Sequence, residues 1–133
     1  MKPARIFATL AALLVVTPSL AQTPALPADA VQLKGAEIGA YLDGKQFATT
    51  IYDADALIVA TVNWNLKKGL VFGTYEVNGT KGEFSNEWTQ KGDTSCGERS
   101  AKGTLICQKV YVAGDTMYEV NKKGKIHAVS QLR

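Results

Sequence analysis

Two cysteines are the first residues of this chain whose type and spacing could do chemistry. Cys96 and Cys107 are its only thiols, and they enclose the polar stretch 97–106. A redox-active pair usually sits closer, as Cys-x-x-Cys at the start of a helix, where the pKa of the attacking thiol is lowered. A zinc site needs about four ligands, whereas the chain offers two thiols and one distant histidine. The N-terminus indicates export to an oxidising compartment, so we predict one structural disulfide, worth about 3 kcal/mol by chain entropy.

The single histidine and the clustered acids are the next candidates. His127 lies in a strand-like segment after Lys125 and has no second histidine as a partner. We therefore interpret it as a solvent-facing strand residue and not as a general base or metal ligand. Asp53 and Asp55 flank a predicted turn, where aspartates cap their own backbone. A paired acid site or a calcium site is the alternative, although calcium needs several more oxygen ligands. We predict no catalytic, metal-binding or cofactor-binding residue and no cofactor.

Aromatic side chains are the candidate binding residues. In a sheet that closes on itself, some of them would point inward and line a pocket. The competing interpretation, which we favour, is that they fill the interior of a narrow barrel. The candidates are Trp64, Trp88, Tyr75, Tyr111 and Tyr118.

The N-terminus has the pattern of a secretory signal. Met1–Ala21 contains Lys2 and Arg5, an apolar run over 6–16 and small residues before the predicted cleavage site. A retained N-terminal anchor is the alternative. A Pro/Ala-rich spacer is expected over 22–32, followed by a single domain over 33–133. We predict a periplasmic or secreted bacterial protein.

Charge excludes one class of partner. The 133 residues carry 15 basic and 12 acidic groups, a net charge of +3. Removing Lys2 and Arg5 with the signal leaves 13 against 12, or +1. Because the basic excess lies mostly in the signal, nucleic acid is not an expected partner. No later apolar run approaches the roughly 20 residues that span a bilayer, so no membrane span is expected after cleavage.

The elements that must position these residues are mostly strands. A helix is predicted over Leu33–Asp43, where Ile38 and Leu42 are one turn apart and Gly44 ends the helix. From residue 46 the apolar period becomes two, and tight turns such as Asn78-Gly79 separate the runs. We predict a mainly β fold: an antiparallel meander of about seven to eight short strands, forming a small barrel or strongly curved sheet with the helix plugging or flanking one end. The predicted strands are 47–52, 57–64, 70–77, 83–90, 104–112, 116–121 and 125–132.

An ordered set of motifs runs along the chain: 33–38, 42–45, 73–77, Trp88, 92–96, 107–111 and 114–118. This set resembles a small exported proteobacterial family, the domain of unknown function nine-nine-five. The resemblance spans nearly the whole mature chain, and it implies a β-rich exported domain with a Cys96–Cys107 bridge. One departure is Lys34, which stands where the family's helix begins with a capping Thr or Ser, so Glu37 lacks a hydroxyl partner. The family has no established activity and implies no catalytic residue.

The sequence thus favours a non-enzymatic binding or interaction module in the periplasm or outside the cell. Two more specific versions are a small-ligand carrier with a hollow barrel and an inhibitor of an envelope-targeting hydrolase. An enzyme that uses carboxylates is the least favoured reading, since it needs two carboxylates about 5–10 Å apart in a cleft. The partner would be an envelope protein or a small ligand.

Overall fold

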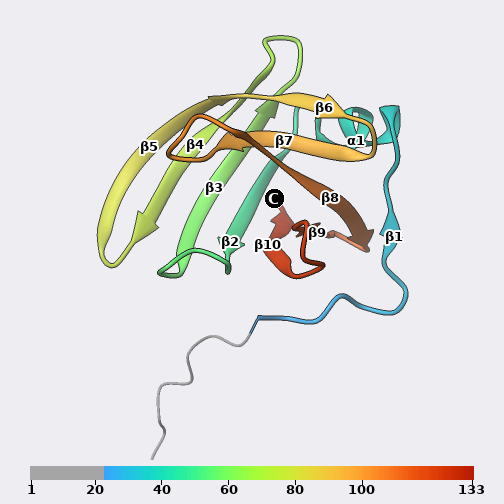
Figure 1. Cartoon of the computed structure of the whole chain (residues 1–133), viewed down its shortest axis with the longest axis horizontal. Coiled ribbons are helices and arrows are strands. Elements are labelled where there is room, and N and C mark those ends of the chain that lie inside the picture. The colour runs from blue at the N-terminus through green and yellow to red at the C-terminus, as the bar shows by residue number, and fades with distance from the viewer. Residues whose placement is uncertain (1–22) are drawn as a thin grey trace, which may run out of the picture.

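The fold is a single antiparallel sheet curled into a half-barrel (Figure 1). It comes from a computed structural model that describes residues 23–133; the predicted signal peptide and its cleavage site lie outside them. The elements are β1 Val31–Gln32, α1 Ala36–Leu42, β2 Gln46–Ile51, β3 Ile58–Asn65, β4 Leu70–Val77, β5 Thr80–Glu87, β6 Thr89–Lys91, β7 Thr94–Arg99, β8 Leu105–Ala113, β9 Thr116–Val120 and β10 Ile126–Leu132.

The strand order explains why the sheet curls. It runs β5-β4-β3-β2-β10-β9-β8-β7-β6, while β1 pairs with the part of β8 beyond the β7 ladder. β5 and β6 follow one another in sequence but lie at opposite edges of this order, so the sheet must bend until its edges approach. β5 and β7 do touch, although no ladder joins them in the described residues. The predicted antiparallel meander is confirmed, with ten strands instead of seven to eight.

Two strands, β1 and β7, were not predicted, and β6 was predicted only as the end of a strand over 83–90. β1 lies in the segment that the sequence assigned to a spacer, and it is held by pairing with Tyr111 and Val112 of β8. The short β6 and β7 surround the turn before Cys96, where the sequence shows polar residues and glycines instead of an apolar run. The apolar pattern of β6 and β7 does not predict two separate strands. Both are held in the sheet by pairing with neighbouring strands.

Two glycines, Gly73 and Gly79, allow backbone geometries that the sheet requires. At Gly73 a Cβ atom would lie 1.8 Å from the backbone oxygen of Thr61 on β3, so the two strand backbones approach more closely than any side chain allows. The β4–β5 hairpin turns at Asn78 and Gly79, whose φ angles are 49° and 77°. Positive φ at both positions is the two-residue turn that matches the twist of a hairpin, as the Asn-Gly pair predicts.

The helix closes one end of the half-barrel. α1 is shorter than predicted, but Ile38 and Leu42 are fully buried on one face against the core. The N-cap residue is Gly35, and its N–H donates to Asp93 Oδ1 at 2.9 Å. Gly44 follows the helix with φ 73°, as the sequence predicts for a helix end. Within residues 23–133 no helix is long and apolar enough to cross a membrane.

The predicted disulfide is present. Cys96 and Cys107 stand directly opposite each other on β7 and β8, and their Cα atoms are 4.2 Å apart. This bond ties β7, which lies next to the edge strand β6, to β8. A stable disulfide is characteristic of an oxidising, extracytoplasmic compartment.

Candidate functional site

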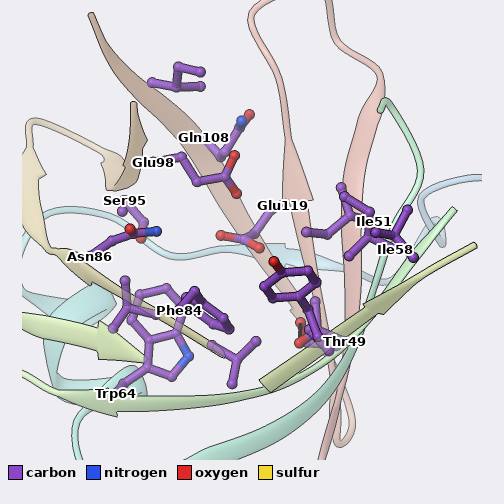
Figure 2. Close-up of a pocket in the computed structure, with 18 residues that line it drawn as sticks. Thr49, Ile51, Ile58, Trp64, Phe84, Asn86, Ser95, Glu98, Gln108 and Glu119 are labelled. Atoms are coloured by element: carbon purple, nitrogen blue, oxygen red, sulfur yellow. Dashed lines mark hydrogen bonds between the residues drawn. The ribbon is translucent and has the colours of Figure 1, made fainter. Parts of the chain in front are cut away.

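The concave side of the sheet holds a cavity of about 260 Å³. The side chains that line it from β3, β4 and β5 are mostly apolar, and a polar group of side chains from β7, β8 and β9 covers another part of the wall (Figure 2). The helix and the packed core fill the end of the half-barrel where β2 begins, and the cavity occupies the remaining interior. The interior is therefore partly packed and partly hollow.

The apolar wall comes from the alternation of the strands. Ala60, Val62 and Trp64 on β3 face inward, while Val59, directly before Ala60, is about half exposed on the outer surface. On β5, Phe84 lines the cavity and Glu83 faces out. The wall thus follows directly from the period-two pattern of the sequence.

An ion-paired histidine lies beside the polar wall. His127 is 5% exposed, and its Nδ1 lies 2.5 Å from Asp53 Oδ1. Its Nε2 lies 2.7 Å from Glu98 Oε1. Asn121 Nδ2 also donates to Asp53 at 3.2 Å, which fixes that carboxylate at the end of β2. The interpretation of His127 as solvent-facing is wrong: both of its ring nitrogens are engaged by carboxylates.

Two irregularities in the ladders bring these groups together. On β10 the pairing with β9 shifts between Ile126 and Ala128, so His127 is an extra residue opposite Glu119 and its neighbour. On β7 the pairing with β8 shifts between Cys96 and Glu98, and Gly97 is the extra residue. A bulge turns the following side chain to the other face, so Glu98 joins Ser95 on the cavity side instead of alternating outward.

Glu119 is the acidic group inside the cavity itself. It lies on β9, lines the cavity with Glu98 and is paired in register with Ala128 of β10. Figure 2 shows the carboxylates of Glu98 and Glu119 reaching into the same space. None of the hydrogen bonds within residues 23–133 reaches the carboxyl of Glu119, since the histidine donates to Asp53 and Glu98.

Asp53, Glu98, Glu119 and His127 form an acidic cluster, in which burial and mutual charges shift the pKa values of Glu119 and His127. Removal from water raises the pKa of Glu119 to about 7; the charge of His127 opposes this shift, and the charges of Glu98 and Asp53 add to it. Burial alone lowers the pKa of His127, but the hydrogen bond to Glu98 and the charges of Glu119, Glu98 and Asp53 outweigh it and raise that pKa to about 9. At neutral pH the imidazole is therefore a cation that donates from both nitrogens, and it has no free lone pair for a proton or a metal.

Two residues of the cavity wall each carry a buried polar atom that has no hydrogen-bond partner among residues 23–133. The atoms are Oε1 of Gln108, an acceptor, and Nε1 of Trp64, a donor. Gln108 and Trp64 are 5% and 6% exposed. Because buried polar groups are normally paired, such atoms in a cavity wall are places where a ligand can complete the bonding.

Two of the five candidate aromatic residues line the cavity, and the other three lie outside its lining. Trp64 and Tyr75 line the cavity, and Trp88 packs edge-on against Trp64 with ring centroids 6.4 Å apart. Trp88 also donates from Nε1 to Ser95 Oγ at 2.9 Å, which orients a polar wall residue. Tyr111 and Tyr118 stand opposite each other on β8 and β9 and do not line the cavity.

Sequence reasoning missed the acidic cluster. Asp55 remains an exposed turn residue, but Asp53 reaches His127. Gly97 was only a partial signal: a glycine inside a strand often marks a bulge, but the sequence pattern did not identify the strand that contains it. Nothing local distinguished Glu119 or His127. Across residues 23–133, no group of three or more His, Cys, Asp or Glu side chains has positions that could hold a metal ion.

Comparison with family models, with curated proteins and with solved structures finds no match for this chain.

Proposed function

We propose that this protein is a non-enzymatic binding module that takes a small, mainly apolar molecule into the concave interior of its half-barrel. The observation that carries this proposal is the cavity of about 260 Å³, which has an apolar wall and a localised polar group. That combination is typical of ligand sites, where apolar contacts supply affinity and a few polar atoms fix orientation. The volume lies just below the usual range for small-molecule sites, roughly 300–1,000 Å³, so the ligand must be small.

Binding is favoured over catalysis by the state of the imidazole. A general base must have a free nitrogen within reach of the substrate. His127 uses both nitrogens in ion pairs and is 5% exposed. We infer that it serves to hold Glu98 and Asp53 in place.

The location that we propose is the bacterial periplasm or the cell exterior. The disulfide supports an oxidising compartment, and the secretory pattern of the N-terminus supplies the route. The motifs that resemble the exported family agree with this placement and specify no ligand.

The test is titration of the protein with 1-octanol by isothermal titration calorimetry. We expect one saturable site with a Kd on the order of 0.1 mM, since burying a methylene contributes about 0.8 kcal/mol. Val77→Trp fills the cavity from β4 and should abolish binding. Glu76→Trp places the same side chain on the exposed face of the same strand and should leave the Kd unchanged. Absence of saturable binding, or equal binding by both variants, would overturn the proposal.

A further inference from the structure

We propose that the ligand carries a cationic head, an amine or ammonium group, which binds to Glu119 with Glu98 and Gln108 beside it. This inference rests on the proposed binding function and specifies the chemical class of the ligand. Three features of the cavity support it: the charge of its wall, the free carboxyl of Glu119 and the orphaned acceptor of Gln108.

The charge of the cavity wall is negative. Glu98 and Glu119 are among its lining residues, whereas no Lys, Arg or His of the described chain lines it. Behind this wall stand the third carboxylate, Asp53, and a single compensating cation, His127. Three carboxylates against one imidazolium leave an excess of negative charge, and a low-dielectric cavity strengthens its attraction for a cation.

The imidazolium of His127 does not donate a hydrogen bond to the carboxyl of Glu119. The imidazolium has two N–H groups, and both donate elsewhere, to Asp53 and Glu98. A carboxylate that faces an apolar cavity without a donor is costly, and it becomes favourable when a charged donor arrives. A ligand ammonium group would supply several N–H donors at once.

Gln108 gives independent evidence for a donor-rich head. Its Oε1 is a buried acceptor without a partner in the described part of the chain, and the residue lines the same cavity from β8. Gln108 is 5% exposed, so bulk water does not compensate this acceptor. An acceptor and two carboxylates in one part of the wall together select a group that donates in several directions, which excludes a carboxylate or phosphate head.

Lysines near the site do not reverse this preference. Lys122, Lys123 and Lys125 lie in the β9–β10 turn and line a neighbouring hollow, which also contains His127. They are exposed to solvent. Their charges are therefore screened by salt, whereas the carboxylates face the ligand directly.

The experiment compares three probes with the same chain and different heads: 1-octylamine, 1-octanol and octanoate, titrated by calorimetry at pH 7.5. We expect octylamine to bind at least about tenfold more tightly than octanol, because a charge-assisted bond replaces a neutral one, and octanoate to bind more weakly than octanol. If octanol binds and octylamine binds no better, the cationic head is refuted while the proposed function stands. If none of the three binds, the proposed function itself fails.

A matched pair of variants locates the head. Glu119→Gln keeps the shape of the side chain and removes its charge, so octylamine should fall to the affinity of octanol while octanol is unaffected. Glu83→Gln makes the same change on the outer face of β5 and should alter neither affinity. An octylamine preference that persists in Glu119→Gln would refute this residue as the anchor.

A second readout needs no variant. Because the pKa of Glu119 is about 7, part of the unliganded protein carries a proton there at neutral pH. Binding of a cation must expel it. Calorimetry at pH 7 in buffers of different ionisation enthalpy should show release of roughly half a proton with octylamine and none with octanol. Equal proton release with both probes would count against the proposal.

Discussion

At the scale of single residues, His127 is the link between two carboxylates from distant parts of the chain. Replacing it with glutamine leaves Asp53, Glu98 and Glu119 facing one another without a cation. We expect His127→Gln to lower the free energy of unfolding at pH 7 by about 2 kcal/mol. Breaking a fully buried pair costs roughly 3–5 kcal/mol, but the Asp53 and Glu98 side chains are 31% and 42% exposed.

Urea denaturation checks this prediction, with Lys125→Gln as the control. Lys125 is an exposed cation just before β10, and its loss should change stability by less than about 0.5 kcal/mol. The pH dependence adds a second test. The raised pKa of His127 gives stability that is complete below pH 6.5 and is lost as the pH rises through about 9. Equal stability of wild type and His127→Gln at pH 6 would contradict the structural role of this ion pair.

Glu119 has the opposite effect on stability, because it lies in the cavity and none of residues 23–133 donates a hydrogen bond to its carboxyl. Its pKa is raised from 4.5 to about 7, so the folded state binds a proton more tightly than the unfolded chain. Stability contributed by this proton is present below pH 4.5 and is lost as the pH rises through about 7. We expect Glu119→Gln to be more stable than wild type by about 2 kcal/mol at pH 8, with no gain at pH 4. Urea midpoints at the two pH values measure this; a gain at pH 4 as large as that at pH 8 would show that titration is not the cause.

At the scale of elements, replacing glycine with alanine should change stability in opposite directions at two positions. Gly73→Ala places a methyl group 1.8 Å from a backbone oxygen of β3, which cannot move without opening the ladder. We expect a loss of about 3 kcal/mol or failure to fold. Gly39→Ala lies within α1, where the nearest atom is the flexible end of Leu66 at 3.4 Å. Its helix propensity should raise stability by about 0.5–1 kcal/mol. Chemical denaturation of both variants compares them, and a stable Gly73→Ala would show that the two strands can separate there.

The elements also show how far the sequence predicts this fold. Period-two alternation and Asn78-Gly79 identify strands and a hairpin because both are local properties of the chain. β1 could not be predicted, since two residues have no period and are held only by β8. The bulges that present Glu98 and His127 are register shifts between strands. A register is set by partners far away in sequence, so only the glycine at position 97 hinted at one of them.

At the scale of the whole molecule, the site exists because of strand order. Asp53 follows β2, and His127 is the second residue of β10. Glu119 lies on β9 and Glu98 on β7, so the order β2-β10-β9-β8-β7 brings the four residues to one region. Neither residue type nor spacing predicts that the last strand lies between β2 and β9. The apolar wall from β3 to β5 was within reach of the sequence, whereas the acidic cluster required the topology.

The disulfide bears on both the stability of the fold and the cavity, because it ties β7 to β8, and β7 carries the cavity residues Ser95 and Glu98. A disulfide stabilises chiefly by restricting the unfolded chain, so its removal should weaken the fold more than the binding site. We expect Cys96→Ser/Cys107→Ser to lose about 3 kcal/mol and roughly 10–15 °C in Tm. Its 1-octanol Kd at 25 °C should stay within about twofold of wild type, because the β7–β8 ladder still positions the wall. Thermal denaturation and calorimetry measure the two effects separately. An unchanged Tm would mean that the disulfide does not stabilise the fold. If the variant keeps the circular dichroism of a β protein but no longer binds octanol, the disulfide itself shapes the cavity.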